Sequence, residues 1–146
     1  MTFYYEDFAV GDGWTVGPRT VTGEEIIAFS EKFDPLPMHT ERDPEGGLFD
    51  DVIASGWHTA AVTMRLMVDG LLADAAVLAG LGVEDLRWPT PVRPDDELTA
   101  EIEVVDREPF DEERGQVDLA VTTTNEDGEV VLSMVVEGLF ARRLEG

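Results

Sequence analysis

The sequence predicts an α+β domain in which an antiparallel sheet wraps around one long central helix. Apolar residues recur at helical spacing over residues 55–76, which predicts the longest helix of the chain. Four later segments are rich in Val, Thr and Leu, as strands are, and a turn sequence, Asn125-Glu126-Asp127-Gly128, separates the last two. No internal repeat, low-complexity tract or flexible linker interrupts residues 1–146, so we expect a single domain.

The N-terminal third is expected to hold one strand, one helix and a long loop. Residues 10–21 alternate loosely around glycines and predict an extended segment. Thr22 and Glu25 form a capping box, in which each side chain bonds the other residue's free backbone N–H, so a helix should begin at Thr22. It should end near Phe33, because a proline follows two positions later and disfavours helical geometry in the residue before it. Residues 34–50 are rich in proline and glycine and predict a long loop with room for one helical turn.

The C-terminal half is expected to form the antiparallel sheet. The predicted strands are Leu86–Val92, Glu97–Val105, Gly115–Thr124 and Glu129–Arg142. In the second of them, Leu98, Ala100, Ile102 and Val104 alternate with polar residues, so one face should be buried and the other partly exposed. The last strand is apolar on both faces, which predicts either a central position in the sheet or burial at a subunit contact.

The charge of the chain is strongly one-sided. Thirty-two acidic residues face ten basic ones, for a formal net charge of -22. This negative field repels phosphate backbones, so we expect no nucleic-acid partner. Because the acids are scattered rather than gathered in one tail, they favour a halophile-type acidic surface suited to high intracellular salt over a docking surface for a basic partner.

The composition also bears on compartment and chemistry. The chain has no cysteine, which excludes disulfides, thiolate metal sites and a cysteine nucleophile. Its first residues carry acids where a secretion signal would carry basic and then apolar residues. The least polar stretch, residues 60–81, is broken by Arg65, Asp69 and Asp74. We therefore expect no membrane span and a cytoplasmic protein.

One candidate site lies in the proline-rich loop. His39 is one of two histidines and ends the segment Phe33-Asp34-Pro35-Leu36-Pro37-Met38-His39, whose prolines restrict the backbone and hold Asp34 and His39 at a defined separation. A carboxylate beside an imidazole forms a proton-transfer pair, because histidine titrates near neutral pH and the acid can orient it or share the task. The alternative is a purely structural role, in which the carboxylate caps a turn and the histidine is exposed to solvent.

A second candidate lies where the long helix should begin, in Ile53-Ala54-Ser55-Gly56-Trp57-His58-Thr59. A helix amino terminus presents free N–H groups and a partial positive charge, and a glycine there lets a ligand approach the backbone closely. A thioester carbonyl placed at Gly56 would be polarised, and the enolate-like oxyanion formed by attack at Cβ would be stabilised. The structural alternative is that Ser55 caps the helix and Gly56 only allows the turn.

Together, the segments Phe33–Thr40 and Ile53–Thr59 resemble the MaoC-like dehydratases, relatives of (R)-specific enoyl-CoA hydratases. Leu86–Trp88 and Pro91–Leu98 resemble the strand and turn that follow in that family, so the resemblance spans roughly residues 5–142. It implies a hotdog fold, an acyl-CoA thioester substrate, and a homodimer whose further assembly stays open.

The resemblance also implies a reaction, the reversible hydration of a trans-2-enoyl-CoA to an (R)-3-hydroxyacyl-CoA. Asp34 and His39 would hold one water molecule between them, activating it towards Cβ while protonating Cα. The Gly56 N–H would bind the thioester oxygen. Coenzyme A would enter only as part of the substrate, and no metal or redox cofactor is expected.

Two residues depart from the family pattern. Leu36 stands where these hydratases often carry Asn, and Ser55 stands where they often carry His. Both departures bear on substrate and rate, and they keep open a non-catalytic acyl-CoA-binding hotdog subunit. An acyl-CoA thioesterase is a further alternative in the same fold, although its water would have to be aimed at the carbonyl carbon.

The remaining candidate substrate-binding residues are Ser55, Trp57, His58, Arg87 and Arg93. Trp57 is a candidate wall of the acyl pocket, and His58 is either a second active-site imidazole or a packing residue. The two arginines, or Arg42, can meet the coenzyme phosphates because guanidinium matches phosphate in geometry. In so acidic a chain they can equally serve as internal salt-bridge partners.

We predict that the protein loses structure at low salt. Raising the salt from about 0.1 M to about 1 M shortens the screening length from about 10 Å to about 3 Å, which weakens repulsion among the surface acids. The melting temperature, followed by circular dichroism, should therefore rise with salt. A melting temperature indifferent to salt would contradict the halophile-type interpretation.

Overall fold

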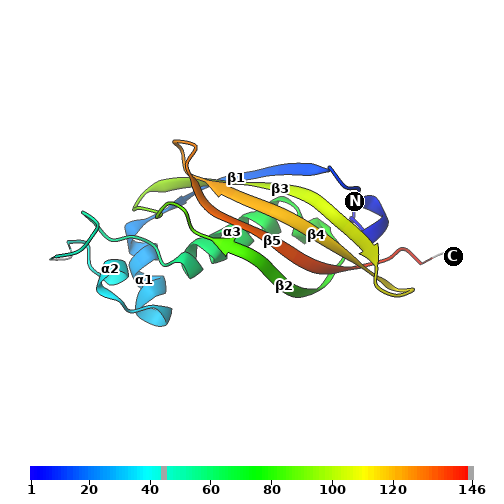
Figure 1. Ribbon diagram of the computed structural model, residues 1–146, viewed down its shortest axis with the longest axis horizontal. Coiled ribbons are helices and arrows are strands. Elements are labelled where there is room, and N and C mark those ends of the chain that lie inside the picture. Colours follow the sequence, from blue (N-terminus) through cyan, green and yellow to red (C-terminus); the bar gives the residue numbers. More distant parts are fainter. Residues whose placement is uncertain (44–45, 145–146) are drawn as a thin grey trace.

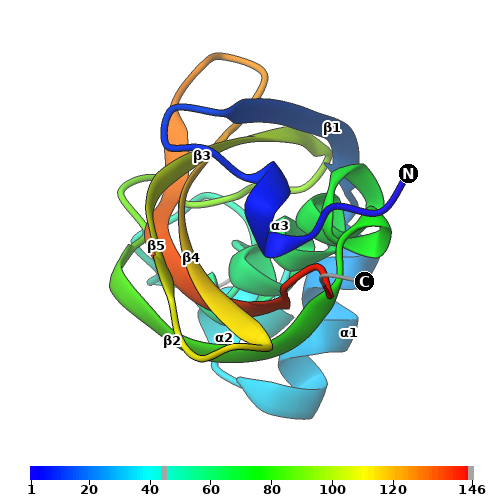
Figure 2. The same ribbon diagram turned by 90° about the vertical axis from the view of Figure 1, so that its right-hand side faces the viewer.

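The computed structural model describes residues 1–43 and 46–144, and its organising element is the helix α3 (Gly56–Gly70). A five-stranded antiparallel sheet curls around this helix, as Figures 1 and 2 show. The strand order is β1-β3-β4-β5-β2, with β1 (Gly13–Val21), β2 (Val77–Arg87), β3 (Asp96–Pro109), β4 (Arg114–Thr124) and β5 (Val130–Ala141). The predicted α+β class, with an antiparallel sheet wrapped around one long helix, is confirmed.

The helix α1 (Gly23–Phe33) begins and ends where the sequence predicts. Thr22 is its N-cap, and the Glu25 N–H donates to Thr22 Oγ1 over 3.1 Å. The helix stops at the residue before the Asp34-Pro35 pair. The short helix α2 (Pro37–Thr40) is the single helical turn expected within the predicted loop. Residues 44 and 45 of that loop lie outside the described residues.

The prediction of a helix over residues 55–76 is wrong at its C-terminal end. The helix α3 stops at Gly70, which packs so tightly on β1 that a Cβ there would overlap the Val16 side chain. A short 3-10 turn, η2 (Leu72–Asp74), then reverses the chain into β2, and a similar turn, η1 (Tyr5–Asp7), precedes β1. Across the described residues, neither α3 nor any other helix is long and apolar enough to cross a membrane.

The predicted strand Leu86–Val92 is also misplaced. The observed strand β2 begins at Val77 and pairs with β5 at one edge of the sheet. Its two glycines and its exposed side chains on both faces remove the alternation by which a strand is recognised. Two prolines follow Trp88 and cannot donate to a neighbouring strand, so the chain leaves the sheet after Arg87.

The other strands follow the predicted alternation. On β3, Leu98, Ala100, Ile102 and Val104 are buried, whereas the acidic residues between them are exposed. The last strand, β5, lies between β4 and β2, so its predicted central position is confirmed. The hydrophobic core therefore lies between the concave face of the sheet and α3, and the amino terminus of α3 points towards α1 and α2 (Figure 1).

Candidate active site

The candidate site contains a histidine whose ring is held by the backbone. His39 lies in α2, and only 8% of it is exposed. Its Nδ1 lies 2.8 Å from the carbonyl oxygen of Ile53, which can only accept a hydrogen bond. Nδ1 therefore carries a proton and donates it, which leaves the Nε2 lone pair available as a base.

Asp34 faces the free nitrogen of His39. Its Oδ2 lies 3.4 Å from His39 Nε2, so the two residues singled out by the proline spacing are neighbours in space. The Asp34 N–H donates to Ser30 O over 2.8 Å, which anchors the residue at the end of α1. A carboxylate oxygen and a neutral Nε2 are both acceptors, and 3.4 Å is long for a direct hydrogen bond. A water molecule that donates one proton to each would satisfy both acceptors.

The amino terminus of α3 supplies one free amide. Ser55 Oγ accepts the Trp57 N–H over 3.3 Å, and Ser55 O accepts the N–H groups of His58 and Thr59 at 3.0 and 3.1 Å. Within the part of the chain that the structure describes, this leaves the Gly56 N–H as the first-turn amide without a protein acceptor. Because this end of the helix also carries a partial positive charge, an oxyanion placed beside Gly56 is stabilised.

Ile53 joins these two elements. Its N–H donates to Met38 O over 2.9 Å, and its carbonyl holds the His39 ring. The next residue, Ala54, donates its N–H to Val92 O over 2.9 Å, which attaches the segment that follows β2. Because Gly56 follows Ile53 by three residues, the imidazole and the free amide are positioned by the same short stretch of backbone.

A cavity of about 350 Å³ is lined by both His39 and Gly56. Trp88 packs directly on the glycine, since a Cβ on Gly56 would lie 2.5 Å from the indole ring. Phe49 contributes to the same lining from the loop before Ile53. Asp34 lies outside this lining but contacts His39, so the three predicted catalytic residues lie near the amino terminus of α3.

The other predicted substrate-binding residues lie outside this lining. Ser55 is buried and caps α3, which is the structural role considered for it as the alternative to substrate binding. Trp57 is 60% exposed and meets Trp88 edge to face, with ring centroids 5.2 Å apart. Arg87 and Arg93 are exposed, and their contact with coenzyme phosphates stays a prediction.

His58 faces the opposite side of α3 from the free amide. It follows Gly56 by two residues, which rotates it by about 200° around the helix axis. Its ring stacks on Phe29 of α1 with centroids 4.8 Å apart. Burial lowers the pKa of His58 below its ordinary value of 6.5; Glu25 opposes this effect and Arg19 adds to it. In this position His58 is a neutral packing residue between α1 and α3.

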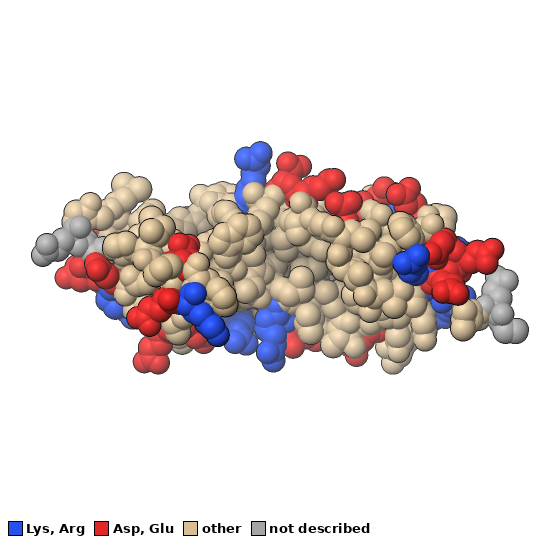
Figure 3. Space-filling model, turned by 90° about the horizontal axis from the view of Figure 1, so that it is seen from below, with Lys and Arg blue, Asp and Glu red and all other residues tan. Residues whose placement is uncertain are grey.

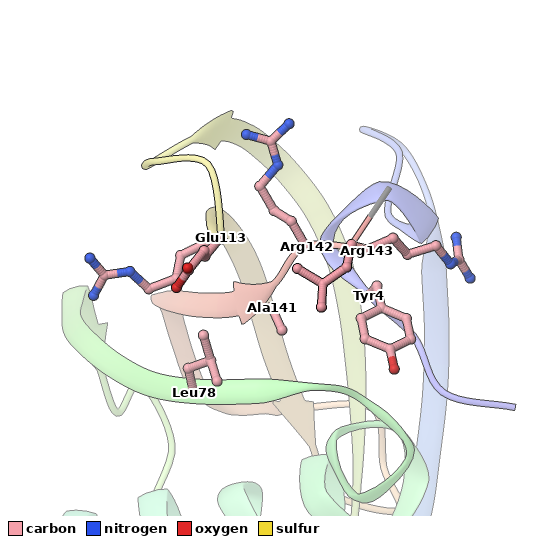
Figure 4. A pocket seen from close by; sticks show the side chains of 8 residues that line it. Tyr4, Leu78, Glu113, Ala141, Arg142 and Arg143 are labelled. Atoms are coloured by element: carbon pink, nitrogen blue, oxygen red, sulfur yellow. The ribbon is translucent and has the colours of Figure 1, made fainter. Parts of the chain in front are cut away.

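A larger pocket, of about 740 Å³, lies at the far end of the molecule near the C-terminus and is shown in Figure 4. Two of its arginines point away from the middle of the pocket and pair with acids, Arg142 with Glu6 at 3.3 Å and Arg143 with Asp7 at 2.7 Å. Its described lining holds no histidine, so it offers no proton-transfer pair. Arg42 likewise pairs with a carboxylate, that of Asp51 at 3.0 Å, so these arginines are internal salt-bridge partners.

Sequence reasoning missed most of the cavity lining, including Phe49, Thr59, Trp88 and Thr90. The position of Thr59 could have been found, because it follows Gly56 by three residues and therefore lies on the same side of the helix. The two prolines after Trp88 signalled a rigid segment without showing what it contacts. Phe49 carries no signal of its own in the sequence.

Comparisons with known proteins find the same family that the sequence motifs resemble. A family model described as MaoC like domain matches residues 11–126. The uncharacterized protein YdeM of Bacillus subtilis (strain 168) is 30% identical over 122 residues, which are 83% of this chain and 86% of that protein. A solved structure of a MaoC-like dehydratase from Rhodospirillum rubrum is 38% identical, with a TM-score of 0.89 over 98% of this chain and 99% of that chain.

A more distant structure shows the fold alone. An R-hydratase from Pseudomonas aeruginosa is 22% identical and has a TM-score of 0.79 over 98% of this chain and 88% of that chain. A conserved hypothetical protein from Mycobacterium tuberculosis with a double hotdog fold is 16% identical and has a TM-score of 0.78 over 99% of this chain and 46% of that chain, so the predicted hotdog fold is confirmed.

We predict that His58 makes the folded protein sensitive to mild acid. An imidazole in the unfolded chain takes up a proton near pH 6.5, whereas burial keeps the folded His58 neutral to lower pH. The unfolded state therefore binds more protons below that value, and the free energy of unfolding falls as the pH drops from about 7 to about 5. In urea unfolding, His58→Phe, which keeps a ring against Phe29, should show a weaker decline; a decline equal to that of the wild type argues against this role.

Proposed function

Because the chain belongs to the MaoC-like domain family, we propose that it catalyses the reversible hydration of a trans-2-enoyl-CoA to an (R)-3-hydroxyacyl-CoA. The observation that carries the proposal is the 3.4 Å separation of Asp34 Oδ2 and His39 Nε2, beside a cavity that also holds Gly56. The likeness to the Rhodospirillum rubrum MaoC-like dehydratase supports the same class of reaction.

The proposed reaction moves protons between one water molecule, His39 and the substrate. The water held by Asp34 and His39 gives a proton to Nε2 as its oxygen attacks Cβ. The electron pair of the double bond moves onto the thioester oxygen, which the Gly56 N–H and the α3 amino terminus stabilise. His39 then returns a proton to Cα, so the pair ends in the protonation state in which it began. Because no electrons leave the substrate, the proposed reaction requires no redox cofactor.

The two departures from the family pattern leave this proposal intact. Leu36 is 48% exposed and lies outside the cavity lining, and Ser55 still caps α3. Neither residue therefore removes a group that the proposed reaction uses. A thioesterase would use the same amide but would need water aimed at the carbonyl carbon, whereas a water bound by the paired Asp34 and His39 fits addition at Cβ and protonation at Cα.

Substitution of either member of the pair should abolish most of the activity. We expect Asp34→Asn and His39→Gln each to lower kcat/KM for crotonyl-CoA hydration by about a hundred- to ten-thousand-fold, the usual contribution of a positioned acid or base. The assay is the loss of enoyl-thioester absorbance, and an unchanged melting temperature would show that each variant is folded.

Glu31→Gln, an equivalent change on the exposed surface of α1, is the matched control and should keep the wild-type rate. Wild-type rates in both pair variants would contradict the proposed mechanism. Release of free thiol in place of hydration would establish the thioesterase alternative.

We further propose a homodimer formed through the face that carries α3 and β2. Met64 and Val68 of α3 line one apolar pocket together with Val77 of β2, and Leu81 and Val83 of β2 are also exposed. Figure 3 shows the molecule from below, with charged side chains mostly along the edges and ends of the view. An apolar edge strand with free backbone groups pairs with another strand unless it is covered. A two-fold axis would pair β2 with the same strand of a second copy, antiparallel.

Introducing a charge at the edge strand should therefore disrupt the dimer. We expect wild-type protein to have the mass of a dimer by light scattering, and Leu81→Asp to shift it to the mass of a monomer, because a buried unpaired carboxylate is costly. Val105→Asp, at a residue of β3 that is 40% exposed, is the control and should remain dimeric. A wild type that is monomeric at micromolar concentration would refute this interface.

A further inference from the structure

The lining of the candidate cavity combines exposed and buried side chains. Trp88 is 40% exposed, whereas Thr59, Val92 and Val131 are 3%, 2% and 0% exposed. A thioester that enters this cavity would leave its charged coenzyme among the exposed side chains and direct its apolar acyl group towards the buried ones.

The two buried valines of the lining, Val92 and Val131, belong to the hydrophobic core, where side chains are packed densely. The cavity volume, about 350 Å³, is near the low end of the roughly 300–1,000 Å³ that small-molecule sites span. An acyl group that enters this cavity therefore meets densely packed core side chains.

Thr59 is a buried residue of the lining and belongs to α3, the helix that carries the free amide. It follows Gly56 by three residues, so the two lie on the same side of the helix, about 4.5 Å apart along its axis. An acyl chain that leaves a carbonyl held at Gly56 and runs beside α3 meets Thr59 after a few carbon atoms. The Thr59 hydroxyl is 3.5 Å from Ser55 O, a weak contact, so the side chain acts on the cavity mainly through its volume.

We propose that Thr59 sets the upper limit of acyl chain length and that the substrates are short-chain acyl thioesters; this inference rests on the proposed function. A second cavity of about 300 Å³, lined by Met64 and Met67 among others, lies farther along α3. Between Thr59 and Met67, a buried hydrogen bond of 2.8 Å between the hydroxyl groups of Thr63 and Thr123 joins the helix to β4. A long acyl chain would have to pass this contact to reach the second cavity.

The test compares Thr59→Ala, which enlarges the cavity, with Thr59→Val, which keeps the volume of the side chain. The ratio of kcat/KM for crotonyl-CoA to that for trans-2-octenoyl-CoA is measured in each. Wild type should prefer crotonyl-CoA by at least about tenfold, because one misplaced methylene changes kcat/KM by about 10- to 200-fold. Thr59→Ala should reduce this preference about tenfold, and Thr59→Val should keep it.

Thr20→Ala is the matched control, because it removes the same atoms at an exposed position of β1, outside the cavity lining. It should keep the wild-type ratio. If Thr59→Ala does not fold, Thr59→Ser removes the methyl alone and should shift the ratio in the same direction. Equal turnover of both substrates by the wild type, or an unchanged ratio in a folded Thr59→Ala or Thr59→Ser, overturns the proposal.

Calorimetric binding of butyryl-CoA and octanoyl-CoA, which cannot be hydrated, separates this inference from the proposed reaction. In one outcome, crotonyl-CoA is not hydrated, but the wild type binds butyryl-CoA more tightly than octanoyl-CoA and Thr59→Ala removes this difference in affinity. The proposed reaction then fails and the limit on acyl chain length stands. If crotonyl-CoA and octenoyl-CoA are hydrated equally well, the limit fails and the reaction stands.

Discussion

The candidate site depends on one peptide segment, the backbone of Ile53, which is hydrogen-bonded at both its N–H and its carbonyl. The N–H donates to Met38 O, which aligns the proline loop with the segment leading into α3. The carbonyl accepts from His39 Nδ1, which selects the tautomer whose Nε2 faces Asp34. Because both bonds use the backbone of Ile53, the tautomer of His39 does not depend on the identity of the Ile53 side chain.

The same segment decides which amide of α3 stays free. The side-chain and carbonyl oxygens of Ser55 accept hydrogen bonds from the backbone amides of the three residues after Gly56. The structural and functional interpretations of this motif are therefore compatible, because the cap that stabilises the helix also isolates the Gly56 N–H. Glycine is required there for packing as well, since any Cβ would meet the Trp88 ring.

Features set by local chemistry could be predicted from the sequence, and features set by distant contacts could not. The start of α1 follows from Thr22 and Glu25 alone, and the proximity of Asp34 and His39 follows from the two prolines between them. By contrast, β2 is an edge strand with exposed residues on both faces, so its sequence lacks the alternation of a half-buried strand. The place of Trp88 over Gly56 depends on where β2 ends, and a misplaced strand therefore hides a wall of the site.

The charge of the chain favours a site built from a neutral imidazole and a backbone amide. Arg42, Arg142 and Arg143 are paired with carboxylates, so their charges are already offset within the fold. The α3 amino terminus instead provides positive potential without a counter-ion, next to buried side chains where salt screens it little. The exposed acids behind the formal net charge of -22 are screened by the same salt. Ionic strength should therefore act on the stability of the fold far more than on the groups proposed to carry the chemistry.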